Sequence, residues 1–257
     1  MAWALITGAS SGLGRQFAYH LAHEGYDLII TARRGDLLDD IAEKIRARYG
    51  VHVDTIVADL SRRDDAYRIV AILEDRQDIC LVINNAGYTL AQEFSETALD
   101  DQIALLEVMV TSVLIITHAA VRSMKIRGEG SILITSSYVA NTAMGIYAAH
   151  KTWDLVFAET LHAQLTDSHI HVTALCPGTL KTDFWSSTNA DLSHPIFALS
   201  ALDLSFVVKE ALKALRRNKA ICIPGRRYRA LNVVKHIAPR SLVNWATVCL
   251  NRRRMHL

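Results

Sequence analysis

Tyr147 and Lys151 stand four residues apart in the segment IYAAHKTWDLVFAE, for which a helix is predicted. One helical turn separates them, so both side chains lie on the same face. A tyrosine alone is a poor acid–base catalyst near neutral pH because its ordinary pKa is about 10. A neighbouring ammonium favours the phenolate and is expected to lower that pKa. The pair could therefore serve as a proton donor or acceptor, although the spacing alone is explained more simply by a solvated lysine beside a half-buried tyrosine.

The composition narrows the classes of protein to which the chain can belong. Its 257 residues are 51% hydrophobic and 21% charged, which is typical of a globular protein with a sizeable core. The formal net charge of +2 is too small to indicate nucleic acid binding. Four scattered cysteines predict reduced thiols in a cytoplasmic protein, and no metal site is expected. Neither a signal peptide nor an apolar run of about 18 residues is evident, so no membrane span is expected.

Short apolar runs alternate with amphipathic stretches along most of the chain. The predicted strands are 2–7, 27–32, 52–58, 79–84, 131–136, 171–176 and 220–223. The predicted helices are 12–23, 36–49, 64–75, 100–127, 147–167 and 204–217. Because several strands are apolar on both faces, we expect a parallel sheet covered by helices. The order predicts a doubly wound, Rossmann-like α/β fold with a seven-stranded parallel sheet over residues 1–225, followed by a basic amphipathic helical extension of the same domain over 226–257.

The first predicted strand runs directly into a glycine-rich turn, TGASSGLG. Gly8 permits a tight turn, Gly12 lets the backbone approach a pyrophosphate, and Gly14 lets the following helix pack on the sheet. The amino terminus of that helix also offers free N–H groups to phosphate. The turn therefore predicts a dinucleotide site formed by Gly8, Ser10, Ser11, Gly12, Leu13 and Gly14.

Two arginines at the end of the second predicted strand indicate which dinucleotide binds. An NAD-specific site places a carboxylate there to hold the ribose 2′-hydroxyl. This chain has Arg33 and Arg34 instead, and guanidinium groups suit a 2′-phosphate. NADP(H) is therefore the predicted cofactor, the alternative being that the two arginines are only a solvated surface pair.

Six segments in this order and at these intervals resemble the short-chain dehydrogenase/reductase family. They cover about residues 2–225 and consist of Thr7–Gly14, Asp59–Leu60, Asn84–Gly87, Ser136–Ser137, Tyr147–Lys151 and Pro177–Thr182. The resemblance implies a reversible hydride transfer between NADP(H) and a carbonyl compound or alcohol.

The resemblance also implies cofactor contacts after several of the predicted strands. Asp59 would accept a hydrogen bond from the adenine amino group, and Leu60 would contact the adenine ring. The turn of Asn85, Ala86 and Gly87 would line the adenosine ribose. The implied contacts beneath or beside the nicotinamide are Pro177, Gly178, Leu180 and Thr182.

The resemblance implies catalytic roles for a tyrosine, a lysine and a serine. Tyr147 would donate a proton to the carbonyl oxygen during reduction, while Lys151 would lower its pKa and hold the nicotinamide ribose. A serine would hydrogen-bond the substrate oxygen and stabilise the developing alkoxide. We favour Ser137 because it directly precedes a short apolar run, and Ser136 stays as the alternative.

Met109 departs from the family pattern, which has at this position an asparagine that anchors a proton-relaying water. A thioether donates no hydrogen bond and accepts only weakly. Backbone carbonyls and Lys151 could hold the water alone, or a nearby polar group such as Thr111 or Ser112 could replace the amide. The third possibility is a slow or repurposed protein, which makes a non-catalytic or weakly catalytic NADP(H)-binding sensor or scaffold the alternative function.

Two later segments bear on substrates and partners. Residues 183–203 contain Phe184, Trp185, Ile196 and Phe197, which could form an apolar lid over a hydrophobic ketone or could merely pack the segment down. Residues 226–257 mix arginines with leucine, valine and tryptophan. This pattern suits a membrane surface or a partner subunit, and we favour the partner. The family resemblance implies a homodimer or homotetramer.

Overall fold

The computed structural model describes residues 2–90, 92–180 and 201–255. Thr182 and the aromatic part of the predicted lid, with Phe184, Trp185 and Phe197, lie outside the described residues. The chain leaves the described part at Leu180 and re-enters it close by, because Leu180 and Leu202 form an isolated parallel bridge.

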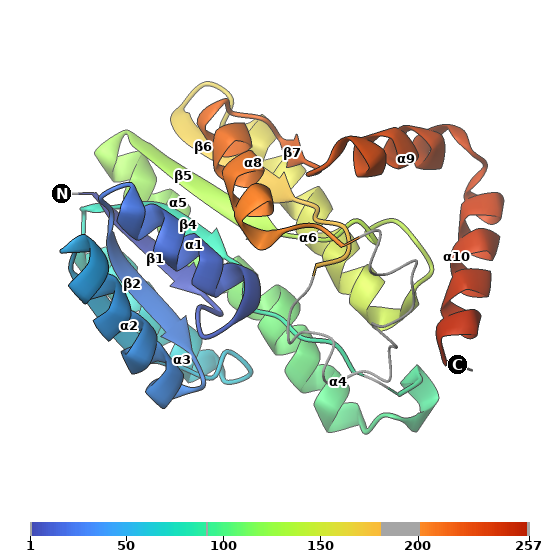
Figure 1. Cartoon of the computed structure of the whole chain (residues 1–257), viewed down its shortest axis with the longest axis horizontal. Coiled ribbons are helices and arrows are strands. Elements are labelled where there is room, and N and C mark those ends of the chain that lie inside the picture. Colours follow the sequence, from blue (N-terminus) through green and yellow to red (C-terminus); the bar gives the residue numbers. More distant parts are fainter. Residues whose placement is uncertain (1, 91, 181–200, 256–257) are drawn as a thin grey trace.

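Seven parallel strands form one sheet in the order β3-β2-β1-β4-β5-β6-β7, which confirms the predicted fold class (Figure 1). The strands are β1 (Trp3–Thr7), β2 (Asp27–Ala32), β3 (Val53–Val57), β4 (Ile79–Asn84), β5 (Glu129–Thr135), β6 (His169–Leu175) and β7 (Ile221–Cys222). The direction in which strands are added reverses between β1 and β4. In such sheets, ligands bind outside the carboxyl ends of the strands at that point.

Helices cover both faces of the sheet (Figure 1). One face packs against α1 (Gly12–His23), α2 (Gly35–Tyr49) and α8 (Leu204–Arg216). The other face packs against α3 (Arg63–Asp75), α5 (Ser112–Arg127) and α6 (Gly145–Gln164). Successive strand residues point to opposite faces, so in β1 Ile6 joins the first core and Leu5 joins the second. Both faces are therefore apolar, which explains the continuous hydrophobic runs in the sequence.

The single helix predicted over residues 100–127 is interrupted. The chain forms α4 (Leu99–Leu106), a π-helical turn η2 (Glu107–Thr111) and then α5; a short 3₁₀ helix, η1 (Phe94–Glu96), precedes them. The extra residue of a π turn re-aims nearby side chains, and such turns are frequent at functional sites. Here the turn carries Met109. Contrary to expectation, the run Leu99–Arg127 is long and apolar enough to cross a membrane by length and composition alone, and half of its apolar window is buried within the fold.

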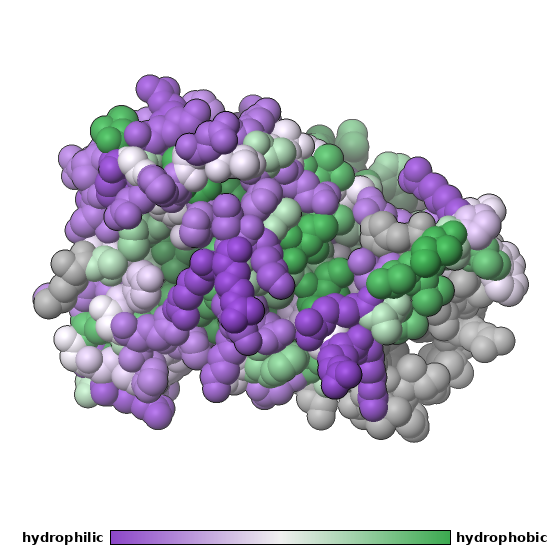
Figure 2. All heavy atoms as spheres, turned by 90° about the horizontal axis from the view of Figure 1, so that it is seen from above, coloured by the Kyte–Doolittle hydropathy of each residue, from purple (hydrophilic) through white to green (hydrophobic). Residues whose placement is uncertain are grey.

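Two helices follow the last strand, α9 (Arg226–Ile237) and α10 (Arg240–Met255). Figure 1 shows them extending from the end of β7, beyond the edge of the sheet. Several apolar side chains of these helices are exposed, namely Leu231, Val233, Val234, Ile237, Leu242 and Trp245. The view from above in Figure 2 shows hydrophobic and hydrophilic side chains mixed on this side of the molecule.

Candidate active site

The predicted catalytic residues converge at the carboxyl end of β5. Ser136 and Ser137 directly follow this strand, and the first two turns of α6 carry Tyr147 and Lys151. The Lys151 ammonium lies 5.9 Å from the centroid of the Tyr147 ring. It donates to the Thr135 carbonyl oxygen at 2.6 Å, which ties α6 to the end of β5.

The two adjacent serines have different surroundings. The Ser137 side chain is hydrogen-bonded to that of Tyr147, and its Oγ also accepts from the Val139 N–H at 3.3 Å. Ser136 is buried and donates from Oγ to the Lys151 carbonyl oxygen at 2.6 Å. The structure therefore brings Ser137 to the phenol, while Ser136 fastens the backbone of α6.

The acidity of Tyr147 differs from the expectation based on spacing alone. Burial raises the pKa of the Tyr147 phenol, and this effect outweighs the opposing effects of the Lys151 charge and the Ser137 hydrogen bond. The nearby negative charge of Asp154 raises the pKa further. The phenol thus holds its proton at neutral pH, as a proton donor must.

Asp154 is a polar residue of this site that the sequence interpretation missed. Its Oδ2 lies 2.9 Å from the Lys151 ammonium, and the two side chains are 1% and 6% exposed. Lys151 and Asp154 are three residues apart, so they share a helix face, and this spacing could have revealed the pair. The site therefore contains a buried ion pair rather than a lysine alone.

The end of β1 is tied to the end of β4 through Thr7. Its Oγ1 accepts hydrogen bonds from the backbone N–H groups of Asn85 at 2.9 Å and Ala86 at 3.0 Å. The Asn85 amide donates in return to the Thr7 carbonyl oxygen at 3.0 Å. The predicted cofactor residues Asn85, Ala86 and Gly87 therefore form a turn held directly against the glycine-rich turn.

The glycine-rich turn has the geometry that its sequence predicts. Gly8 and Gly12 adopt φ angles of +71° and +51°, which favour glycine. A side chain at Gly14 would collide with the Gly8 carbonyl oxygen, so the absent Cβ allows α1 to pack closely. Ser11 is the N-cap of α1 but makes no side-chain capping bond, and the first turn of α1 carries no acidic residue. This helix terminus can therefore receive an anion.

The predicted arginines stand beside this turn. Arg34 donates to Ser10 Oγ from Nη2 at 3.0 Å and from Nε at 3.3 Å, and the guanidinium of Arg33 lies 5.7 Å from the centroid of the Tyr88 ring. Both arginines are exposed. They place positive charge next to the glycine-rich turn rather than on an unrelated surface.

The predicted adenine residues follow β3, where Leu60 is buried. Asp59 Oδ1 accepts from the Ser61 hydroxyl at 2.8 Å and from the Ser61 N–H at 3.1 Å, so its carboxylate is held in a fixed turn.

Two residues of α9 contact the loops around the site, and no local sequence pattern indicates these contacts. Tyr228 packs its ring on Gly178 and accepts a hydrogen bond from the Thr179 N–H at 3.0 Å. The Lys235 ammonium donates to the carbonyl oxygens of Tyr138 at 3.1 Å and Ala140 at 2.8 Å. The C-terminal extension thus fixes both the segment after Ser137 and the Pro177–Gly178 segment.

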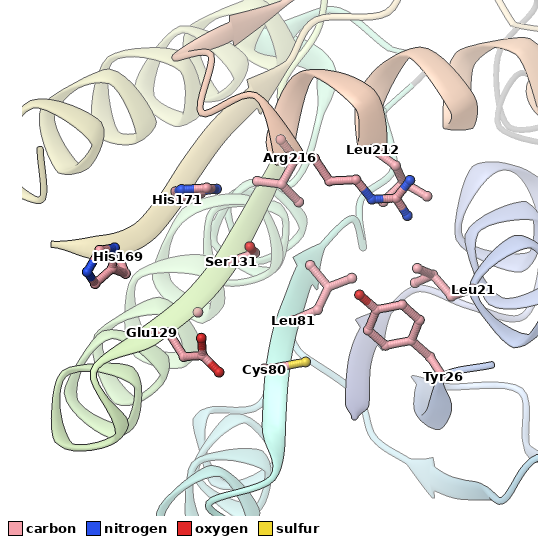
Figure 3. A pocket seen from close by; sticks show the side chains of 12 residues that line it. Leu21, Tyr26, Cys80, Leu81, Glu129, Ser131, His169, His171, Leu212 and Arg216 are labelled. Atoms are coloured by element: carbon pink, nitrogen blue, oxygen red, sulfur yellow. The ribbon is translucent and has the colours of Figure 1, made fainter. Parts of the chain in front are cut away.

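A cleft lies at the opposite, amino-terminal ends of the strands (Figure 3). It contains none of the predicted catalytic or cofactor residues, and its polar lining comes from Tyr26, Cys80, Glu129, Ser131, His169, His171 and Arg216. Within residues 2–90, 92–180 and 201–255, no cluster of three or more His, Cys, Asp or Glu side chains could hold a metal ion.

Comparison with known proteins assigns the chain to a family. The model of the short chain dehydrogenase family matches residues 2–193, so the chain belongs to this family. A very-long-chain 3-oxoacyl-CoA reductase of Phaeosphaeria nodorum is 30% identical over 190 residues, which are 67% of this chain and 56% of the relative. The match therefore spans little more than half of that relative's length.

Two solved structures have the same fold over nearly the whole chain. A short-chain dehydrogenase from Sphingobium yanoikuyae in complex with NADPH is 29% identical, with a TM-score of 0.83 over 92% of this chain and 94% of that one. A bulky-bulky ketone specific alcohol dehydrogenase from Comamonas testosteroni is 26% identical, with a TM-score of 0.79 over 92% of each chain.

The contact between α9 and the Pro177–Gly178 segment can be tested with Tyr228→Phe. This change removes the acceptor of the Thr179 N–H and should lower the free energy of unfolding by about 1 kcal/mol. Urea denaturation measures the difference, and Tyr67→Phe on the exposed face of α3 is the matched control. Equal stability of Tyr228→Phe and the wild-type protein would mean that this hydrogen bond does not fasten the segment.

Proposed function

We propose that the protein is an NADP(H)-dependent oxidoreductase that interconverts a ketone, or another carbonyl compound, and a secondary alcohol. The observation that carries the proposal is the constellation of Ser137, Tyr147 and Lys151 at the carboxyl end of β5. A hydroxyl, a phenol and an ammonium within reach of one another are the groups needed to move a proton to and from a carbonyl oxygen.

The residues at the carboxyl ends of β1 and β2 fit NADP(H). The positive φ angles of Gly8 and Gly12 and the uncapped amino terminus of α1 suit a pyrophosphate. Arg33 and Arg34 suit the additional 2′-phosphate, since guanidinium groups form strong charge-assisted hydrogen bonds with phosphate. The NADPH bound to the Sphingobium yanoikuyae enzyme supports the same assignment. Asp59 and Leu60 would lie along the adenine, and Asn85 to Gly87 along its ribose.

The chemistry divides between the cofactor and the side chains. NADPH, when bound, supplies a hydride to the carbonyl carbon. Tyr147 donates its phenolic proton to the carbonyl oxygen, and the Ser137 hydroxyl donates a hydrogen bond to the same oxygen as negative charge develops there. The ammonium of Lys151 stabilises the resulting phenolate. Pro177, Gly178 and Leu180 would border the nicotinamide, and Thr182 is assigned there from the family pattern alone.

A hydrophobic ketone is the proposed substrate class. The aromatic residues Phe184, Trp185 and Phe197 in the sequence favour it. Two relatives are compatible with it, one a very-long-chain 3-oxoacyl-CoA reductase and the other a bulky-bulky ketone specific alcohol dehydrogenase.

Met109 is the observation that favours a second candidate, a non-catalytic or weakly catalytic NADP(H)-binding sensor or scaffold. Its side chain is fully buried at the position where the family has asparagine. Binding of NADPH without turnover of any ketone would favour this candidate.

We also propose that the protein forms a homodimer or homotetramer. Apolar side chains that are exposed in the single chain support this, among them Ile103, Leu106 and Leu114 on α4 and α5 and Trp245 on α10. The cytoplasmic location stays a prediction from the sequence.

Turnover tests the proposed function directly. With a panel of long-chain acyl, aromatic and steroid-like ketones, the wild-type protein should oxidise NADPH, which is followed by absorbance. Tyr147→Phe lacks the proton donor and should lose roughly 10²–10⁴-fold in kcat while NADPH affinity, measured by fluorescence, is retained. Turnover that survives in Tyr147→Phe at the wild-type rate would overturn the assigned chemistry.

The two serines provide an internal control for the same assay. Ser137→Ala should lower kcat by about 10²-fold or more, because a donor to the developing alkoxide is lost. Ser136→Ala removes the bond to the Lys151 carbonyl oxygen, so its larger effect should be on thermal stability. The reverse pattern would assign the catalytic role to Ser136.

Cofactor preference tests the role of the arginines. Arg34→Ala should weaken NADPH binding roughly tenfold to a hundredfold and leave NADH binding unchanged, because only NADPH carries the 2′-phosphate. Arg48→Ala is the matched control, since Arg48 is also exposed and stacks on a tyrosine at the far end of α2. An equal loss for both cofactors would refute the assignment of Arg34 to the 2′-phosphate.

A further inference from the structure

Asp154 is one of the most deeply buried ionisable groups in the described part of the chain. Its side chain is 1% exposed, and Oδ2 accepts from the Lys151 ammonium at 2.9 Å. Its other oxygen, Oδ1, makes no hydrogen bond to any described residue. A carboxylate in such surroundings is costly unless a nearby positive charge compensates it. The Lys151 ammonium is the positive charge in contact with it.

The neighbourhood of Lys151 on the side of the π turn is apolar. A Cβ added at Gly87 would lie 2.7 Å from the Met109 sulfur and 3.9 Å from the Lys151 nitrogen, so both border this glycine. The Met109 thioether is only a weak acceptor. The strong acceptors that the described residues offer to the ammonium are thus the Thr135 carbonyl oxygen and Asp154.

We propose that Asp154 is a positioning residue for Lys151, fixing its ammonium and keeping it charged at a site where Met109 supplies no polar partner. The inference rests on the proposed function, in which Lys151 acts on Tyr147. An ammonium has three N–H donors, so the bonds to Thr135 and Asp154 leave one for a ligand of the site.

The titratable groups around Lys151 show how the Asp154 carboxylate affects the pKa of the ammonium. Burial acts against the ammonium, but Asp154 and Tyr147 together hold the pKa of Lys151 above its ordinary value. His150 on α6 has its pKa lowered by burial and by Lys151, and burial raises the pKa of Cys176 at the end of β6 to about 12. Both are therefore neutral near pH 7. Burial raises the pKa of the Asp154 carboxyl, while the charge and the hydrogen bond of Lys151 act against that rise. Asp154 is thus the acidic group in contact with the ammonium, and each member of the pair favours the charged form of the other. Without it, burial would lower the pKa of Lys151.

Asp154→Asn tests the inference because it removes the charge and preserves the shape. Lysine labelled with ¹³C at Cε reports the titration of Lys151 by NMR, and Lys151→Arg identifies its signal. Lys151 should titrate at lower pH in Asp154→Asn than in the wild-type protein. Asp27→Asn is the matched control, since Asp27 is another buried carboxylate, bonded to the His52 N–H at the start of β2. An unchanged Lys151 titration in Asp154→Asn would overturn the inference.

Kinetics give a second readout that a merely structural role would not move. For ketone reduction, kcat/KM is measured as a function of pH. The decline of kcat/KM at high pH, its alkaline limb, should move to lower pH in Asp154→Asn. The value of kcat should also fall roughly tenfold or more. Both follow from losing the charged Lys151 at lower pH. A lower kcat with an unmoved limb would make Asp154 a structural residue and contradict the inference.

The two readouts separate this inference from the proposed function. If the wild-type protein reduces no ketone, the proposed function fails, and the NMR titration still decides the role of Asp154. If the wild-type protein is active and Asp154→Asn keeps both its titration and its alkaline limb, the function stands and the inference fails. If Asp154→Asn does not fold, the titration of Lys151 in the wild-type protein tests the inference instead. A Lys151 pKa below the ordinary lysine value would contradict the inference.

Discussion

The ammonium of Lys151 is buried at the carboxyl end of β5, and a charge in that position has to be compensated by fixed partners. Thr135 provides a carbonyl oxygen from the last residue of the strand, and Asp154 provides a carboxylate from the next turn of α6. Ser136 adds a bond to the Lys151 backbone. Strand and helix are thereby held in one register, and this register brings the side chains of Ser137 and Tyr147 together.

The remaining parts of the site are attached to this centre by short polar contacts. Thr7 joins the glycine-rich turn to the segment after β4, so the region assigned to the cofactor is continuous with the ends of the central strands. On the other side, Tyr228 and Lys235 of α9 hold the segments that follow β6 and β5. The C-terminal extension therefore has a role in shaping the site in addition to any role as a surface for partners.

Patterns local in sequence predicted most of the fold and much of the site. Apolar runs separated by amphipathic helices were sufficient to predict the parallel sheet, and the glycine spacing was sufficient to predict the turn after β1. Both features depend on residues that are neighbours in the sequence. The π turn at Met109 and the contacts of Tyr228 depend on tertiary packing, which periodicity does not reveal. Asp154 was missed, because its spacing from Lys151 does not report that both side chains are buried. The acidity of Tyr147 was predicted in the wrong direction for the same reason.

Transfer of deuterium tests the central claim, that this site performs hydride transfer to a carbonyl. The protein would be incubated with a ketone and NADPH deuterated at either face of nicotinamide C4, and the alcohol analysed by mass spectrometry. The account predicts that one of the two labelled cofactors, and only one, delivers a single deuterium to the carbinol carbon. NADPH that binds to the protein yet delivers deuterium from neither face to any ketone would contradict it.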